Sequence, residues 1–190
     1  MSKLEIIAVL FGLANLTLII LRRIENYIFG IIMVSLYAWI FYHAHLYSDT
    51  LLQVFFFVIQ IFGWVQWSRG KTDDGSIAVL RSSLKELTLA ALATIAFAAA
   101  LGAFMHTHTD ASFPYNDASV AALSVTGQAL MSWRRLENWY FWIAANAVAA
   151  PLYFVKHLYP TAALYLVFLV MAIIGLQSWR KQLTHQPATT

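Results

Sequence analysis

The sequence predicts an all-α integral membrane protein with seven transmembrane helices, built from two parallel three-helix repeats joined by one linker helix. Three observations support this fold class. Hydrophobic residues make up 61% of the chain and charged residues only 11%, whereas about a quarter of the residues in a soluble domain are charged. The apolar residues form seven runs of membrane-spanning length. A segment that covers two or more of these runs recurs later in the chain with a similar sequence.

The seven apolar runs follow one another along the chain with short polar segments between most of them. The first begins near Leu4 and has no small-residue cleavage site after it, so it is expected to be a retained span. Arg-Arg and His-Leu-Tyr segments separate later runs, and polar residues from Gln182 onward are expected to form a frayed tail. The predicted spans are residues 4–21, 27–44, 50–67, 87–105, 117–133, 139–156 and 161–179.

The distribution of basic residues predicts the orientation of these spans. If the N-terminus lies outside, only Lys3 and Lys156 fall on the outer side, and the other ten lysines and arginines fall on the opposite side. Basic residues concentrate in cytoplasmic loops, so the N-terminus is expected outside and the C-terminus in the cytoplasm. The net charge of +3 is spread over short clusters between apolar runs, which is not the single basic patch of a nucleic-acid-binding protein.

An internal repeat organises the chain. Residues 22–67 and 134–179 align without a gap at an offset of 112, with 16 identities in 46 positions. The polar matches R-R-x-E-N and H-L-Y carry most of the weight, because apolar matches between membrane helices are common. The expected parts are a first three-helix repeat (1–67), a cytoplasmic loop with the linker helix (68–105), and a second repeat with the polar tail (106–190).

Chemistry at membrane depth is limited to amides and aromatic rings. Every acidic residue falls at a span end or in a loop, and no lysine or arginine lies in the middle of a span. Ion-coupled carriers usually need an ionisable group there, so uncoupled passage is predicted. No nucleophile–base pair or HExxH-type metal site is present, and the chain has no cysteine, so no enzyme activity, metal or cofactor is expected. His106 and His108 are expected in an exposed outer loop.

Helical spacing groups the amides and aromatic residues into stripes on the third, fifth and sixth spans. A buried amide costs several kcal/mol unless it is hydrogen-bonded, so these stripes are expected to face protein or a cavity. A pocket of amides and aromatic faces would suit hydroxyl groups and a flat or cationic ring. The alternative is that the amides join helices and the rings form interfacial belts. The candidate substrate-binding residues are Gln53, Gln60, Trp64, Gln128, Asn138, Trp139, Trp142, Asn146 and Tyr153.

Several motifs resemble the PnuC family of bacterial vitamin transporters. They are N-Y-x-F-G at 26–30, L-L-Q-V-F-F-F at 51–57, G-W-x-x-W at 63–67, and E-N-W-x-x-W at 137–142, followed by Asn146. The resemblance extends from about residue 8 to residue 181. A tryptophan pair after Glu-Asn in this position of a parallel repeat is specific, whereas an isolated W-x-x-W would not be.

The resemblance implies uptake of nicotinamide riboside across the bacterial inner membrane, with relatives that carry thiamine. It also implies facilitated diffusion that is made one-way when the substrate is phosphorylated inside the cell, a homotrimer in the lipid bilayer, and a role for Trp139 and Trp142 in the substrate site. Thiamine or another B-vitamin precursor remains an alternative substrate, because thiamine also has a cationic ring and a hydroxyl group. A receptor or scaffold that binds such a ligand without transporting it remains open as well.

Overall fold

The computed structural model describes residues 3–43, 45, 47–71 and 77–185, and within these ranges the chain forms seven helices. Each helix coincides with a predicted span, which confirms the all-helical fold class. The helices are α1 (Lys3–Ile20), α2 (Asn26–His43), α3 (Tyr47–Ser68), α4 (Leu84–His108), α5 (Pro114–Ser132), α6 (Asn138–Val155) and α7 (Tyr159–His185).

Two predicted boundaries are wrong. Helix α4 continues through His106 and His108, which form its last turn instead of an outer loop, and the Thr109 amide closes that turn on the Met105 carbonyl. His108 Nδ1 lies 3.2 Å from the Phe104 carbonyl, and a histidine near a helix C-terminus can bond the last carbonyls of the helix. Helix α7 continues past Gln182 to His185, because residues 180–183 are good helix formers and can propagate the helix beyond its apolar part.

The helices differ in how well they suit a lipid environment. By length and composition, Asn26–His43 (α2), Leu84–His108 (α4) and Tyr159–Thr184 (α7) are apolar enough to cross a membrane, and α1 and α3 contain shorter apolar stretches, Ile7–Ile20 and Gln53–Ser68. In α4 only Thr94 and Gly102 are buried, so its aliphatic side chains face outward, as expected for a helix solvated by lipid.

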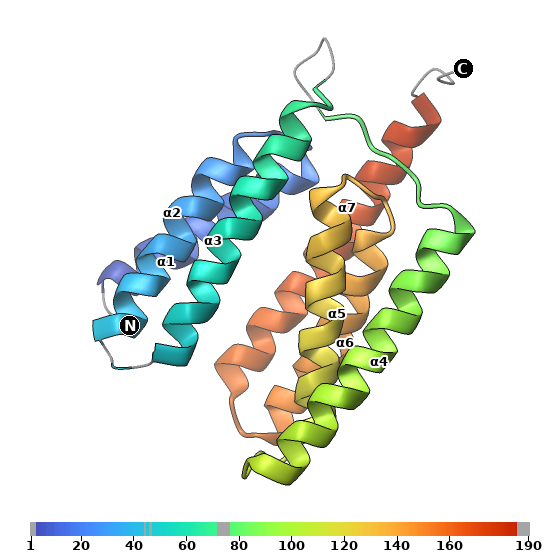
Figure 1. Cartoon of the computed structure of the whole chain (residues 1–190). Helices are drawn as coiled ribbons and strands as arrows, with labels where there is room; N and C mark the ends of the chain where they lie inside the picture. The colour runs from blue at the N-terminus through green and yellow to red at the C-terminus, as the bar shows by residue number, and fades with distance from the viewer. Residues whose placement is uncertain (1–2, 44, 46, 72–76, 186–190) are drawn as a thin grey trace. The chain divides into compact units, whose positions relative to one another are not determined.

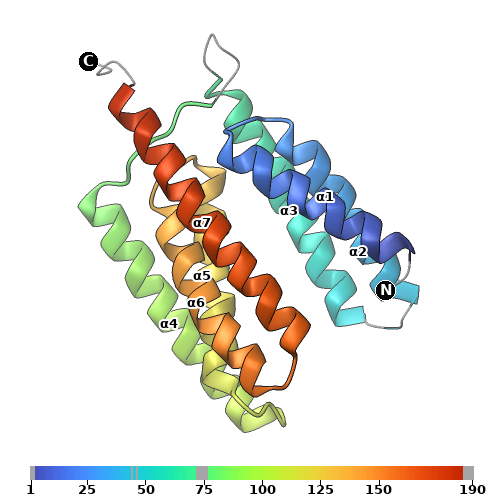
Figure 2. The ribbon, with the colours of Figure 1, turned by 180° about the vertical axis from the view of Figure 1, so that it is seen from behind.

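The chain divides into two compact units. The first comprises residues 1–78 and 132–134, and the second comprises residues 79–131 and 135–190. In the first unit α2 packs against both α1 and α3, and in the second α6 packs against α7. Each unit can be followed by itself as a bundle of adjacent helices, blue to cyan for α1–α3 and green to red for α4–α7 (Figures 1 and 2).

The same turn geometry appears in both copies of the repeat. Arg22 and Arg134 adopt positive φ angles of 57° and 61°, and so do His45 and His157, at 60° and 58°. These four residues form two pairs at the 112-residue offset. A left-handed conformation is uncommon for residues other than glycine, so its recurrence at equivalent positions shows that the repeat extends to the backbone.

An asparagine completes each arginine turn. Asn26 Nδ2 donates to the Arg23 carbonyl at 2.7 Å, and Asn138 Nδ2 donates to the Arg135 carbonyl at 2.6 Å. Both asparagines are buried at the start of their helices, 1% and 0% exposed. Each side-chain amide is therefore a second donor to a carbonyl that already accepts from the backbone N–H of the same asparagine, and it reinforces the turn.

An aromatic ring lies over a glycine in each bundle. Tyr27 covers Gly63 and meets Trp67 edge-on, with ring centroids 5.3 Å apart and planes at 89°. Trp139 covers Gly175 and meets Trp179 in the same way, at 5.5 Å and 89°. A Cβ at either glycine would overlap the ring, so the absence of a side chain is what allows the two helices to approach.

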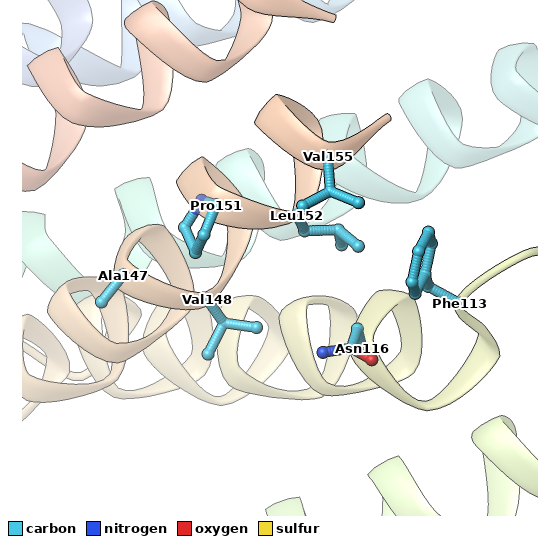
Figure 3. Close-up of a pocket in the computed structure, with 7 residues that line it drawn as sticks. All are labelled: Phe113, Asn116, Ala147, Val148, Pro151, Leu152 and Val155. Carbon is cyan, nitrogen blue, oxygen red and sulfur yellow. The ribbon is translucent and has the colours of Figure 1, made fainter. Parts of the chain in front are cut away.

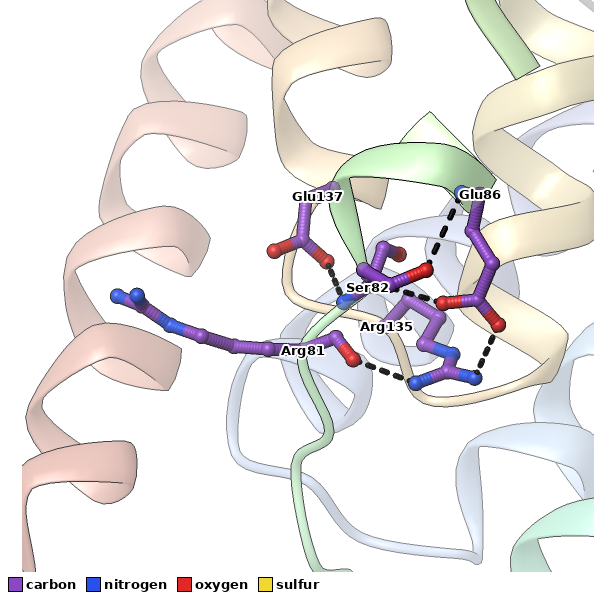
Figure 4. A network of polar contacts seen from close by, with 6 residues as sticks. Arg81, Ser82, Glu86, Arg135 and Glu137 are labelled. Atoms are coloured by element: carbon purple, nitrogen blue, oxygen red, sulfur yellow. Dashed lines mark hydrogen bonds and ion pairs between the residues drawn. The ribbon is translucent and has the colours of Figure 1, made fainter. Parts of the chain in front are cut away.

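Arg81 and Ser82, just before α4, are hydrogen-bonded to the second copy of the arginine turn (Figure 4). Arg135 donates to Glu86 at 2.8 Å and to the Arg81 carbonyl at 2.5 Å, and Glu137 accepts from the Ser82 amide at 2.8 Å. Glu86 also forms a capping box with Ser83, which starts α4. This polar network fixes the beginning of α4 within the second unit.

The first copy of the turn uses the same residue types differently. Arg23 pairs with Glu25 two residues away at 3.0 Å, and both side chains are more than 40% exposed. The hydrogen bond from the Arg23 guanidinium lowers the pKa of the Glu25 carboxyl below its ordinary value. Exposed pairs of this kind contribute little to stability, so the Arg23–Glu25 pair has a local role, whereas Arg135 and Glu137 of the second copy have a tertiary one.

We predict that Gly63→Ala and Gly175→Ala each destabilise the protein by about 1–3 kcal/mol, because the new methyl group must displace a buried ring. The apparent melting temperature of the detergent-purified protein measures this effect. Gly12→Ala is the matched control, since its Cβ would meet only the flexible end of Met33. Equal melting temperatures for all three variants would contradict the packing argument.

Candidate functional site

The interior of α6 carries a buried amide, Asn146. Asn146 is 4% exposed and lies near the middle of the helix. Its Nδ2 donates to the Trp142 carbonyl one turn earlier, at 2.8 Å. A primary amide offers two donors and two acceptor positions, so this single bond leaves most of its capacity for another partner. Its depth agrees with the sequence prediction.

Trp142 lies one turn before Asn146 and contacts α5. The nearest atom to a Cβ built at Gly127 would be Trp142 Nε1, at 3.1 Å. The indole nitrogen is buried, and it has no hydrogen-bond partner among the residues that the structure describes. Buried indole N–H groups usually find an acceptor, so this donor is available to an oxygen atom of a ligand.

Trp139 occupies a different position from Trp142. It is 1% exposed, and its six-membered ring lies over Gly175. Because Tyr27 makes the same contact with Gly63 in the first bundle, the geometry favours a packing role for Trp139. Asn138 is likewise engaged in the arginine turn. Both remain predicted site residues, although their surroundings resemble those of scaffold residues.

The first unit holds three of the predicted residues. Gln60 is 9% exposed on α3, whereas Gln53 is half-buried and Trp64 is 38% exposed. A Cβ at Gly30 would lie 2.5 Å from Gln60 Nε2 and 2.8 Å from Asn15 Nδ2. Gln60 therefore belongs to a buried amide cluster with Asn15, which donates to the Asn26 carbonyl at 2.7 Å.

Sequence reasoning missed Asn15, although the repeat offset could have found it. Asn15, Gly30 and Gln60 of the first copy correspond to Gly127, Trp142 and Ala172 of the second. In one bundle two amides converge above a glycine. In the second bundle Gly127 and Ala172 replace the two amides, and the Trp142 indole replaces the glycine. We infer that similar volumes hold amides in the first bundle and an aromatic ring in the second.

The last two predicted residues lie on α5 and at the end of α6. Gln128 is half-buried and directly follows Gly127. Tyr153 stacks on Tyr165 of α7, with ring centroids 5.0 Å apart and an interplanar angle of 23°. The structure thus places Trp142, Asn146 and Gln128 in one bundle next to the α5–α6 contact, while Tyr153 lies about two turns farther along α6.

A groove of about 440 Å³ lies in the second unit between the start of α5 and the last turns of α6 (Figure 3). Asn116 contributes its only polar side chain. Pro151 has no N–H to offer the Ala147 carbonyl, so that carbonyl lacks its usual helical partner. The lining residues are Phe113, Asn116, Ala147, Val148, Pro151, Leu152 and Val155.

Comparison with known proteins gives a consistent result. The chain matches the nicotinamide mononucleotide transporter family over residues 2–181. The nicotinamide riboside transporter PnuC of Escherichia coli (strain K12) is 28% identical, with 94% of this chain and 85% of that protein aligned. PnuC of Neisseria mucosa is 26% identical, with 95% and 73% aligned.

A more distant relative carries another vitamin. The riboflavin/roseoflavin transporter RibM of Streptomyces davaonensis is 24% identical over 73% of this chain and 66% of its own length. The crystal structure of the vitamin B3 transporter PnuC has a TM-score of 0.77 to this structure at 23% identity, covering 98% of this chain and 84% of that one. This likeness confirms the fold.

The seven-helix fold and the family match both extend over nearly the whole chain. The relatives named above are transporters and not enzymes. This protein therefore belongs to the nicotinamide mononucleotide transporter family.

Proposed function

We propose that this protein takes up nicotinamide riboside across the bacterial inner membrane by facilitated diffusion, and that phosphorylation inside the cell traps the substrate. The observation that carries the proposal is the open hydrogen-bonding capacity on α6, at the unpartnered Trp142 N–H and the partly used Asn146 amide. It occurs in a chain whose relatives in Escherichia coli and Neisseria mucosa are nicotinamide riboside transporters. By family resemblance, the proposed assembly is a homotrimer.

The chemistry of these groups suits this substrate. Nicotinamide riboside has a cationic pyridinium ring, a carboxamide and ribose hydroxyl groups. The Trp142 N–H can donate to a carbonyl or hydroxyl oxygen, and the Asn146 amide can both donate and accept. Aromatic faces attract the cationic ring. Thiamine is the alternative substrate, because its charged ring and hydroxyl group could use the same contacts.

The placement of charged residues supports uncoupled transport. In α4 and α5 the charged residues lie in the terminal turns, and in α7 they lie in the last turns. Ionisable groups in the middle of membrane helices mark proton and ion relays, and the central turns of these helices have none. A carrier without such a group equilibrates its substrate, so net uptake requires that the product be consumed inside.

We predict that proteoliposomes containing the purified protein take up labelled nicotinamide riboside down its gradient, and that imposed proton or sodium gradients do not change the initial rate. Enclosing a riboside kinase and ATP should convert equilibration into accumulation. Excess thiamine should compete weakly. A rate that depends strongly on either ion gradient would refute uncoupled transport, and uptake of thiamine in preference to the riboside would select the alternative substrate.

We predict that Trp142→Ala and Asn146→Ala each weaken riboside binding about tenfold or more, because each removes a buried hydrogen-bonding group from the site. Binding by isothermal titration calorimetry to the detergent-purified protein measures the loss. Trp39→Ala is the matched control, since Trp39 is 59% exposed on α2 and is expected to leave affinity unchanged. Unchanged affinity in both α6 variants would place the pocket elsewhere.

We predict a periplasmic N-terminus and a cytoplasmic C-terminus, because ten of the twelve basic residues would then face the cytoplasm. Fusions at the C-terminus test this orientation: green fluorescent protein should fluoresce and alkaline phosphatase should be inactive. The same reporters inserted after Thr109 should give the opposite result. A C-terminal phosphatase that is active would reverse the proposed topology.

A further inference from the structure

An ion pair joins α5 to α6 at one end of the second bundle. Lys156 Nζ lies 2.8 Å from both carboxylate oxygens of Asp117. The two side chains are 24% and 25% exposed, so water reaches the pair although most of it is covered. In the proposed orientation, this end of the bundle faces outward.

The Lys156 ammonium also contacts an aromatic ring. Its Nζ lies over the ring of Tyr153, 5.9 Å from the centroid. Tyr153 is backed by Tyr165, which stacks on it at 5.0 Å. A carboxylate on one side and an aromatic face on another are what a protein uses to bind an organic cation. The ammonium thus marks a position where positive charge is stabilised.

The repeat does not require this lysine. Extending the 112-residue offset, Asp117 corresponds to Glu5 and Lys156 corresponds to Ala44. The sequence keeps an acidic residue in both copies and a lysine in only one. The lysine is therefore specific to the second copy, where Trp142 and Asn146 also lie.

We propose that Asp117 and Tyr153 form a recognition site for the cationic ring of the transported substrate, and that Lys156 occupies this site as a tethered competitor until the substrate displaces it. The proposal rests on the proposed function only in taking the substrate to be a pyridinium riboside. Displacement exchanges one cation for another, so Asp117 stays neutralised. A neutral ring of the same shape would leave Asp117 without a cation, so the site should select a charged ring.

The test compares two substrates that differ in ring charge, nicotinamide riboside and its neutral 1,4-dihydro form, in proteoliposomes. For Lys156→Met the KM of the cationic riboside should fall about threefold, the size of one cation–π contact, while the KM of the dihydro form stays the same. Asp117→Asn should raise the KM of the cationic riboside several-fold and again spare the neutral form. Lys156→Arg keeps a tethered cation and should retain wild-type selectivity.

Arg180→Met is the matched control, because Arg180 also lies over a tyrosine ring, 5.6 Å from the Tyr140 centroid, in the same unit. It should leave the ratio of the two KM values unchanged. If Lys156→Met raises both KM values equally, or changes neither, the ion pair only fastens α5 to α6 and the proposal is overturned.

A separate probe keeps the recognition site testable if the wild-type protein moves neither riboside. 1-Methylnicotinamide, methylated on the ring nitrogen, carries the same cationic ring without the sugar, and its binding to the purified protein can be followed by tryptophan fluorescence. Tighter binding to Lys156→Met than to wild type would uphold the site while the proposed function failed. Equal affinities would overturn the site itself.

Discussion

In each bundle the helix that follows the arginine turn lies against the last helix because an aromatic ring rests on a glycine. Lipid gives membrane helices no hydrophobic reason to associate, so close packing has to supply the attraction. In the second bundle the ring is Trp139 and the glycine is Gly175. This contact also fixes the rotation of α6 about its axis. Trp142 and Asn146 follow at three and seven residues, so the same contact directs both side chains toward the bundle.

Much of this architecture could be predicted from the sequence because the bilayer allows few alternatives: each apolar run must be a helix that bonds its own backbone. The position of Asn146 deep in its span followed from the same reasoning. Periodicity identified the stripe of α6 but could not tell which neighbour faces it, so Trp139 was grouped with Trp142 although its ring packs on Gly175. The pairing of Asp117 with Lys156 joins different helices across 39 positions, and no local pattern predicts it.

The two arginine turns show how one motif can serve two purposes. In the first copy Arg23 and Glu25 neutralise each other at the surface, whereas in the second Arg135 and Glu137 bind the segment that leads into α4. The backbone of the turn is the same in both cases, down to the positive φ of the leading arginine. The extra helix therefore uses polar groups that the duplicated turn already carried, together with its own Ser83–Glu86 capping box.

The exchange of Asn15, Gly30 and Gln60 for Gly127, Trp142 and Ala172 limits how the two halves could have diverged. A tryptophan introduced at Gly30 alone would collide with both amides, and loss of the amides alone would leave an empty space in the bundle; either change costs several kcal/mol. Each single substitution would therefore destabilise the bundle until the compensating substitutions are also present. Once the duplicated halves had diverged along this route, no single substitution would make them alike again, so the structural asymmetry between the two bundles would persist.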